Sequence, residues 1–312
     1  MDSGKTFVAG HKGLVGGAVM RALERRGVSV VVADRAQIDL RKGEEVDSFF
    51  QEYRPEVVYL AAAKVGGILA NSERPVDFLL DNLQIQSNVI SSAHRWGVQK
   101  FIFFGSSCIY PRLAEQPIAE NSLLTGPLEP TNEWYAIAKI AGIKLCQAFR
   151  KQYGFRAISL MPTNLYGPGD NFDLHTSHVL PALIRKFHLA KINNEPKVVV
   201  WGTGTPRREF MHVDDLADAA LFLAENYDSP DIINVGVGDD ISISELGSLI
   251  ASVVGYAGAV SYDLSKPDGT PRKLLNVDKL QSLGWKATIP LKRGIEETYS
   301  WFLSHKATAD RT

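Results

Sequence analysis

Short runs of β-branched and aromatic residues alternate with amphipathic segments through the first half of the 312-residue chain, and this alternation is what most constrains its fold. Such an order predicts a parallel sheet covered by helices on both faces. The expected strands are residues 6–9, 28–33, 57–61, 100–104 and 157–161. The expected helices are residues 16–26, 43–53, 75–96 and 133–153. The sequence therefore predicts an α/β fold with a doubly wound parallel sheet.

The second half of the chain differs in composition. Pro, Gly and Asn become frequent in residues 162–171, which predicts a loop that forms part of a site. Further helices are expected at residues 179–191, 214–225, 244–254 and 291–304, and further strands at residues 198–201 and 232–235. This pattern predicts a smaller C-terminal α+β lobe that returns in part to the sheet.

Charge and cysteine content exclude several classes of protein. Thirty-four Lys and Arg stand against 35 Asp and Glu, whereas nucleic acids and anionic membranes require a concentrated cationic face. The longest apolar stretch, residues 57–70, contains Lys64 and is too short to span a bilayer. Only two cysteines, no Asn-x-Ser/Thr sequon and a polar start without signal-peptide character fit a reducing compartment. We expect a soluble cytoplasmic protein that binds neither nucleic acid nor membrane.

A glycine-rich turn follows the first expected strand and precedes a helix, in the segment Gly10-His11-Lys12-Gly13-Leu14-Val15-Gly16. Glycines there allow a tight turn and close approach of a pyrophosphate, whose charge then lies at a helix N-terminus. The triplet by itself also fits an ordinary glycine-rich turn, but its position favours a Rossmann-type dinucleotide site. A Walker A motif at Gly4-Lys5-Thr6 is excluded, because its upstream glycine would precede Met1.

The choice between NAD and NADP depends on the end of the second strand. Asp34 is placed to bind the ribose diol of NAD, whereas Arg35 and Lys12 could grip a 2′-phosphate. Two cations against one carboxylate favour NADP(H). Asp39 and Leu40 are expected to lie beneath the adenine.

Three further residues indicate proton transfer. Ser106 follows a buried strand, at the carboxyl end where parallel α/β sheets bind ligands. Tyr135 and Lys139 lie one helical turn apart. A phenol with a pKa near 10 is a poor acid at neutrality, so a nearby cation is expected to lower the pKa of Tyr135. A Tyr-x-x-x-Lys pair alone is common, but its order after the glycine turn and Ser106 indicates a catalytic set.

The glycine turn, Ser106 and Tyr135-x-x-x-Lys139, in that order, resemble the extended short-chain dehydrogenase/reductases that process nucleotide sugars. The resemblance covers nearly the whole chain and narrows to the GDP-L-fucose synthase family in five segments. These are residues 61–68, 105–111, 129–133, 162–168 and 266–273. It implies conversion of GDP-4-keto-6-deoxy-D-mannose to GDP-L-fucose, by epimerisation at carbons 3 and 5 and reduction of the 4-ketone with NADPH.

Cys108 and His178 are the epimerase residues that the resemblance implies. Cys108 lies two residues beyond Ser106, and a thiol needs only modest tuning to act as a base. His178 would be its partner acid, since imidazole titrates near neutrality. By contrast, Cys146 is expected to be an ordinary buried residue. A metal site at Asp170, Asp173, His175 and His178 lacks a recognisable ligand spacing, and we expect none.

The resemblance also implies the binding residues. The substrate set is Lys186, Trp201, Arg208 and Asp268. The cofactor set is Gly10, His11, Lys12, Gly13, Leu14, Val15, Gly16, Arg35, Asp39, Leu40, Lys139, Pro162, Thr163, Asn164, Leu165 and His178. Lys12 and Lys186 stand where this family is expected to have arginine. Lysine keeps the positive charge but loses the bidentate geometry of the guanidinium group. Residues 1–164, joined by 205–236, would bind NADP, and residues 165–204 and 237–312 would bind the GDP-sugar.

Two alternatives stay open from the residues. One is another nucleotide-sugar epimerase or dehydratase with tightly bound NAD, although dehydratases of this superfamily typically have an acidic residue where Cys108 stands. The other is a non-catalytic NADP-binding regulator, although such a protein would not need Ser106, Tyr135 and Lys139. By analogy, we expect a homodimer that pairs through the helices at residues 75–96 and 133–153.

Overall fold

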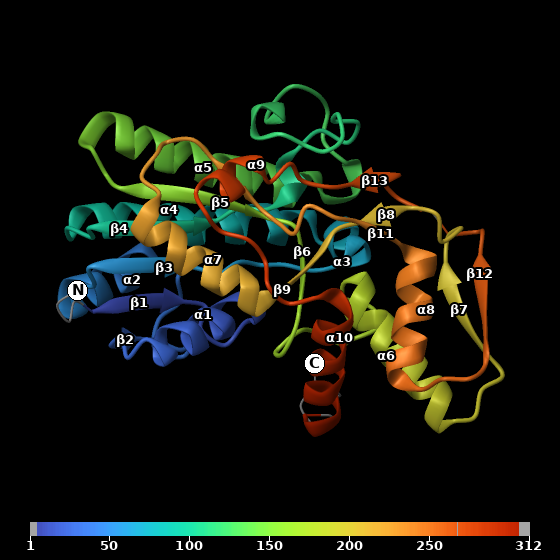
Figure 1. The fold of residues 1–312 in the computed structure, drawn as a ribbon. Helices are drawn as coiled ribbons and strands as arrows, with labels where there is room; N and C mark the ends of the chain where they lie inside the picture. The colour runs from blue at the N-terminus through green and yellow to red at the C-terminus, as the bar shows by residue number, and fades with distance from the viewer. Residues whose placement is uncertain (1–4, 267, 306–312) are drawn as a thin grey trace.

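The central sheet of the computed structural model, which describes residues 5–266 and 268–305, has six parallel strands (Figure 1). Expectations about residues 1–4, Pro267 and residues 306–312 therefore lie outside the described residues. The strand order is β10-β5-β4-β3-β1-β2. The strands are β1 (Thr6–Ala9), β2 (Val30–Val31), β3 (Val57–Leu60), β4 (Lys100–Phe104), β5 (Ala157–Pro162) and β10 (Ile233–Val235). This arrangement confirms the predicted Rossmann-type sheet.

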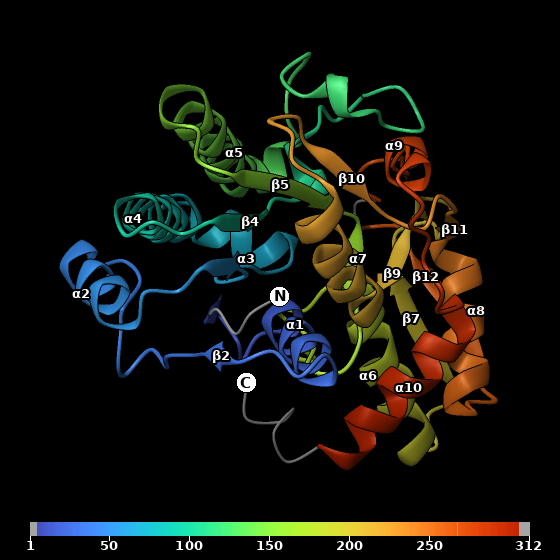
Figure 2. The same cartoon turned by 60° about the vertical axis from the view of Figure 1, so that its left-hand side comes forward.

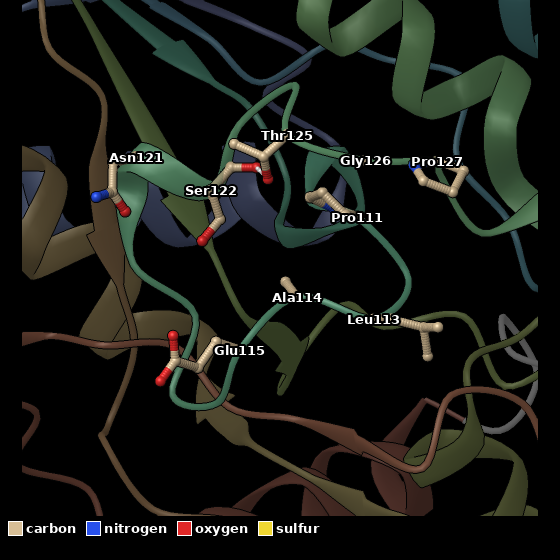
Figure 3. Close-up of a pocket in the computed structure, with 9 residues that line it drawn as sticks. All are labelled: Pro111, Leu113, Ala114, Glu115, Asn121, Ser122, Thr125, Gly126 and Pro127. Carbon is tan, nitrogen blue, oxygen red and sulfur yellow. Dashed lines mark hydrogen bonds between the residues drawn. The ribbon is translucent and has the colours of Figure 1, made fainter.

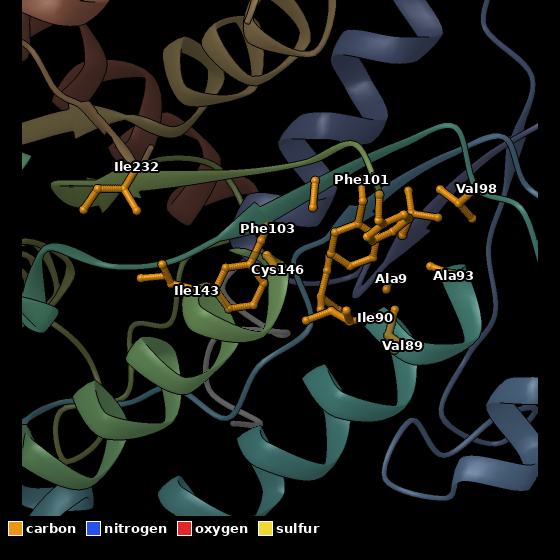
Figure 4. Close-up of a cluster of buried hydrophobic side chains, with 14 of the residues drawn as sticks. Ala9, Val89, Ile90, Ala93, Val98, Phe101, Phe103, Ile143, Cys146 and Ile232 are labelled. Atoms are coloured by element: carbon orange, nitrogen blue, oxygen red, sulfur yellow. The ribbon is translucent and has the colours of Figure 1, made fainter. Parts of the chain in front are cut away.

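Helices cover both faces of this sheet (Figure 2). One face carries α2 (Gly43–Tyr53), α4 (Asn82–Arg95) and α5 (Glu133–Tyr153), and the other carries α1 (Leu14–Arg25) and α7 (Val213–Asn226). Both faces of the sheet are apolar, because the side chains of each strand alternate between them. In β4, Phe101 and Phe103 enter the core beneath α2, α4 and α5, whereas Ile102 and Phe104 enter the core beneath α1 and α7. Figure 4 shows Phe103 packed beside Ile143 and Cys146. Cys146 is 2% exposed, as predicted for a structural thiol.

A third, smaller core lies beside the sheet and contains α6 (Val179–Ile192), α8 (Ile243–Val254) and α10 (Leu291–Ser304). Leu183, Phe187 and Leu246 are among its buried side chains. Strands β7 (Lys197–Trp201) and β12 (Ala259–Asp263) pair in parallel at its outer side (Figure 1). None of the helices in residues 5–266 and 268–305 combines the length and the apolar character needed to cross a membrane.

Three short strand pairs join the two parts, and the sequence did not predict them. Strand β8 (Arg207–Arg208) lies between β11 (Ile241–Ser242) and β13 (Arg272–Lys273), and β6 (Asn164–Tyr166) pairs with β9 (Phe210–His212). The expectation of loop throughout residues 162–171 is therefore wrong for β6. Its pairing depends on contact with residues more than 40 positions away, which local composition does not reveal.

Other boundaries also differ from expectation. The expected strand 28–33 is reduced to β2 at the sheet edge, where Val32 is exposed. The expected helix 75–96 is a π-turn, η1 (Asp77–Asp81), followed by α4. The Asn82 side chain donates to the Phe78 carbonyl at 2.7 Å at this junction. Short helices α3 (Ile68–Glu73) and α9 (Asp278–Ser282), and 3₁₀ turns η2 (Ser107–Ile109), η3 (Glu120–Ser122) and η4 (Pro130–Asn132), complete the chain.

Candidate active site

The glycine turn joins β1 to α1, and the fold requires glycine at two of its three glycine positions. Gly10 has φ +88°, and a Cβ there would lie 2.7 Å from the Ala62 nitrogen. A Cβ on Gly16 would lie 2.6 Å from the carbonyl carbon of Gly10, so the fold itself requires glycine. A Cβ on Gly13 would meet only ordinary contacts, the nearest at 3.5 Å. Space therefore remains at Gly13, where α1 begins.

This helix terminus suits an anion. Gly13 is the N-cap residue of α1, and the first turn, all of it within the described residues, has neither a side-chain cap nor an acidic residue. The backbone N–H groups and the positive end of the helix dipole therefore face an uncompensated position. The turn fits the pyrophosphate of a dinucleotide.

Asp34 and the cations expected to discriminate between NAD and NADP lie together. Lys12 Nζ is 2.7 Å and His11 Nε2 is 3.3 Å from the Asp34 carboxylate, and the hydrogen bond from Lys12 lowers the pKa of Asp34. Arg35 is exposed beside them. Lys12 thus offsets the carboxylate charge that would repel a 2′-phosphate.

The expected adenine residues have contacts of their own. Arg41 bonds both carboxylate oxygens of Asp39, which lowers the pKa of that carboxyl group. Leu40 packs against the core beneath the sheet. Their contact with adenine stays a prediction.

Ser106, Tyr135 and Lys139 meet at the carboxyl end of β4. Ser106 caps η2, where its Oγ accepts from the Cys108 N–H at 3.2 Å, and its hydroxyl is close enough to Tyr135 to act against the rise in the pKa of that phenol. Helix α5 presents Tyr135 and Lys139 on one face. The Lys139 ammonium is buried, donates to the Phe104 carbonyl at 2.8 Å and lies 5.8 Å from the centre of the Tyr135 ring.

The expected lowering of the pKa of Tyr135 is wrong for the free protein. Desolvation by the surrounding protein raises this pKa, the Cys108 charge raises it further, and the Ser106 hydrogen bond opposes them only in part. Lys139 does not offset these effects because its ammonium is directed at the Phe104 carbonyl. Burial also lowers the pKa of Lys139, to about 8. Tyr135 is therefore held as a neutral phenol, the form that donates a proton.

Lys139 should make folding stability depend on alkaline pH. Its pKa is about 8 in the folded protein and 10.5 ordinarily, so the unfolded chain binds more protons between these values. The penalty for burying the ammonium is fully present below pH 8 and disappears as the pH rises to 10.5. We expect wild-type unfolding free energy to gain up to about 3 kcal/mol over this range relative to Lys139→Met. Denaturant unfolding of both proteins from pH 7.5 to 10.5 checks this, and a constant difference between them would contradict it.

Cys108 lies on η2 with two side-chain donors at its sulfur. Asn132 Nδ2 is 3.3 Å and Lys273 Nζ is 3.4 Å from Sγ. A small cavity beside the sulfur is lined by Glu129 and Arg272 as well as these residues. Sequence reasoning gave no role to Asn132 or Lys273, although both lie within the family-like segments that could have drawn attention to them.

His178 is the N-cap residue of α6, and the preceding segment is fixed to the loop after β3. Gly67 N–H donates to the Thr176 carbonyl at 2.9 Å, and a Cβ on Gly67 would lie 2.8 Å from the Ser177 carbonyl oxygen. His178 is exposed to solvent, and desolvation by the neighbouring protein together with the charge of Lys273 lowers its pKa. Lys273 thus acts electrostatically on the histidine and directly contacts the cysteine.

A buried carboxylate that the sequence did not single out, Glu209, organises the expected nicotinamide segment. Its side chain accepts from the N–H groups of Val237 and Gly238, at 2.6 and 2.8 Å, and from that of Leu275 at 3.1 Å. Its own carbonyl accepts from the side chains of Thr163 and Asn164. Glu209 therefore fixes residues 162–165 to the strand that carries Arg208.

The expected substrate residues lie around β7 and β8. Trp201 is 48% exposed, and Lys186 Nζ lies 5.2 Å from its ring centre. Lys266, which the sequence did not single out, lies 5.3 Å from the same ring. Asp268 accepts from the Thr203 N–H at 2.7 Å and hydroxyl at 2.8 Å. Burial lowers the pKa of Arg208, while Asp268 and Glu129 oppose that shift, so these groups share one electrostatic environment.

A separate hollow lies in the loop of residues 111–127 (Figure 3). Leu113, Glu115 and Ser122 are among its lining residues. Its lining within the described chain includes none of the predicted catalytic or substrate residues. Over residues 5–266 and 268–305, no group of three or more His, Cys, Asp or Glu side chains is arranged to hold a metal ion. Asp173 instead accepts bonds from the N–H groups of His175 and Thr176.

The parallel sheet, the glycine turn and the Ser-Tyr-Lys set define a dinucleotide-dependent enzyme of the extended short-chain dehydrogenase/reductase class. The family model described as NAD dependent epimerase/dehydratase family matches residues 6–236. Among curated relatives, probable GDP-L-fucose synthase 1 of Oryza sativa subsp. japonica is 58% identical over 99% of this chain and 94% of its own. GDP-L-fucose synthase of Escherichia coli K12 is 54% identical over 98% of both chains.

One of the solved structures that resemble this chain is also a GDP-L-fucose synthetase. The GDP-L-fucose synthetase from Naegleria fowleri, bound to NADP, has a TM-score of 0.91 and is 32% identical, covering 99% of this chain and 97% of that one. The chain belongs to the NAD dependent epimerase/dehydratase family and, within it, to the GDP-L-fucose synthases.

Proposed function

We propose that this chain converts GDP-4-keto-6-deoxy-D-mannose to GDP-L-fucose at one site, with distinct residues for the epimerase and reductase steps. The observation that carries the proposal is the placement of the Cys108 thiol beside the Ser106 and Tyr135 pair at the carboxyl end of β4. The enzyme is an NADP-dependent oxidoreductase with epimerase activity.

The epimerisation depends on removing protons beside a ketone. In our proposal, Cys108 takes the proton from carbon 3 or 5, and the electron pair moves onto the 4-keto oxygen. Ser106 and Tyr135 donate hydrogen bonds to that oxygen and stabilise the enolate. His178 returns a proton on the opposite face, and its lowered pKa makes the imidazolium a stronger donor.

The reduction uses the other half of the site. When bound, NADPH supplies the hydride for the 4-keto carbon. Tyr135 gives its proton to the resulting alkoxide, which its neutral state allows. Lys139 would hold the nicotinamide ribose, and its ammonium, buried against the Phe104 carbonyl, is already in a fixed position. Residues 162–165, fixed by Glu209, would line the nicotinamide end.

The two ligands occupy different parts of the chain in this proposal. The turn of residues 10–16, with Lys12 and Arg35, would hold the cofactor phosphates on a domain made of residues 1–164 and 205–236. Residues 165–204 and 237–312 would form the GDP-sugar lobe. There, Lys186 and Arg208 would meet the diphosphate, and the exposed ring of Trp201 would offer a platform for the base.

Assembly and location extend the proposal. Helices α4 and α5 lie side by side (Figures 1 and 2), and apolar side chains around them are exposed, namely Leu80 at 48%, Trp134 at 41% and Ile137 at 38%. A homodimer through this face would bury them. We place the enzyme in the cytoplasm, which both free cysteines support.

The decisive experiment offers GDP-4-keto-6-deoxy-D-mannose with NADPH or NADH. We expect oxidation of NADPH in preference to NADH, and a product with inverted configuration at carbons 3 and 5. Tyr135→Phe should reduce the turnover by 10²–10⁴-fold while leaving the fold intact. A folded wild-type protein that oxidises no cofactor would support the non-catalytic alternative. A preference for NADH would overturn the assignment of Lys12 and Arg35.

A further inference from the structure

Lys273 is brought to the active site by a strand held on both sides. Strand β13 pairs in parallel with β8, so that Lys273 is opposite Arg208. The Glu209 N–H donates to the Lys273 carbonyl at 3.3 Å. The next residue, Leu274, donates its N–H to the Gln116 side chain at 2.9 Å. The backbone at Lys273 is therefore fixed before any ligand binds.

The environment of the Cys108 sulfur suits a thiolate better than a thiol. Two nitrogen donors, Lys273 Nζ at 3.4 Å and Asn132 Nδ2 at 3.3 Å, are within hydrogen-bond distance of it. A thiol is a weak donor and a weak acceptor, whereas a thiolate accepts several charge-assisted hydrogen bonds. An ammonium at this distance stabilises the negative charge directly.

Other titratable groups lie near the same sulfur, on the neighbouring elements. Arg208 on β8 and Tyr135 on α5 interact with it electrostatically. Glu129, before η4, would oppose a thiolate, but Arg112 lies 3.2 Å from its carboxylate and offsets that charge. Within the described chain, Lys273 is the cation at hydrogen-bond distance from Sγ.

We propose that Lys273 is a positioning residue that keeps Cys108 as the thiolate. This proposal rests on the epimerase function assigned above and adds a source for its base. The thiolate forms an S–H bond as the substrate C–H bond breaks, and the electron pair passes to the 4-keto oxygen. Lys273 keeps its proton throughout and acts through the charge of its ammonium group.

Alkylation of Cys108 tests the proposal without any substrate. In a Cys146→Ser background Cys108 is the single thiol, and its rate of reaction with iodoacetamide follows the thiolate fraction. We expect Lys273→Met to slow alkylation at pH 7 about tenfold and Lys273→Arg to restore most of the rate. The rates should converge at pH 10, where thiols ionise without help. Lys266→Met, which removes a cation beside Trp201, is the matched control and should leave the rate of Cys108 alkylation unchanged at both pH values.

Three outcomes would overturn the proposal. Lys273→Met could leave the pH profile unchanged, or it could slow alkylation equally at pH 7 and pH 10, which would indicate altered access. It could also weaken binding of the GDP-sugar while alkylation stays the same, which would make Lys273 a substrate contact. Lys273→Gln serves as a second neutral variant if the first fails to fold. Failure of the substrate assay alone would contradict the proposed function and leave this result standing.

Discussion

Replacing Cys108 with serine is expected to slow exchange of the substrate protons at carbons 3 and 5 with deuterated solvent by 10²–10⁴-fold. A serine hydroxyl has almost the size of the thiol but does not ionise at neutral pH, so the base is lost while the shape of the site remains. The exchange is measured without NADPH, by NMR or mass spectrometry of the recovered GDP-sugar. This isolates epimerisation from reduction.

The reductase residues stay intact in Cys108→Ser, so cofactor oxidation should continue at a measurable rate. Its product would then keep the original configuration at carbons 3 and 5. The matched control is Cys146→Ser. Cys146 is buried in the core beneath the sheet, beside Phe103 and Ile143 and apart from the residues that the proposed mechanism uses. We expect that control to exchange like the wild type. Exchange at the wild-type rate in Cys108→Ser would remove Cys108 from the mechanism.

The parts of the fold that local sequence could predict are those with a strong internal pattern. Strand β4 is buried throughout, and its boundaries and those of α2, α5 and α10 agree with expectation residue for residue. The glycine turn was recognisable because two of its glycines have no room for a Cβ. In the strand, the helices and Gly16, the constraint lies within a few residues of the chain, whereas Gly10 is constrained by Ala62 on the loop after β3.

The parts that could not be predicted depend on contacts between distant residues. Lys273 reaches Cys108 across 165 positions, and Glu209 bonds Leu275 across 66. No periodicity marks such residues, since Lys273 lies on a two-residue strand and Glu209 stands between strands of two and three residues. The prediction that Lys139 lowers the pKa of Tyr135 was wrong for a related reason. Spacing placed Lys139 one turn away, but only the fold shows that its ammonium turns to the Phe104 carbonyl.

The glycine turn gives the sharpest test of how sequence serves fold and ligand separately. Gly16→Ala should destabilise the protein by about 3 kcal/mol or more, because the new Cβ would overlap the carbonyl group of Gly10 and only backbone could move. Gly13→Ala should fold within about 1 kcal/mol of wild type, since its φ of -80° suits alanine and a Cβ there has 3.5 Å of clearance. Denaturant unfolding measures both.

The affinity for NADPH should show a different effect of the Gly13 substitution from the one that stability shows. A methyl group on Gly13 would stand where the pyrophosphate must approach the start of α1, so we expect Gly13→Ala to weaken NADPH binding at least 10²-fold despite its stable fold. Gly17→Ala is the control within the same helix: its Cβ would have 3.6 Å of clearance, and it should add about 0.5–1 kcal/mol of stability without changing affinity. Fluorescence titration of NADPH reports the affinity. Wild-type affinity in Gly13→Ala would mean that the pyrophosphate lies elsewhere, whereas a stable Gly16→Ala would mean that the turn can open. Because one substitution acts on the fold and the other on the ligand, neither result can stand in for the other.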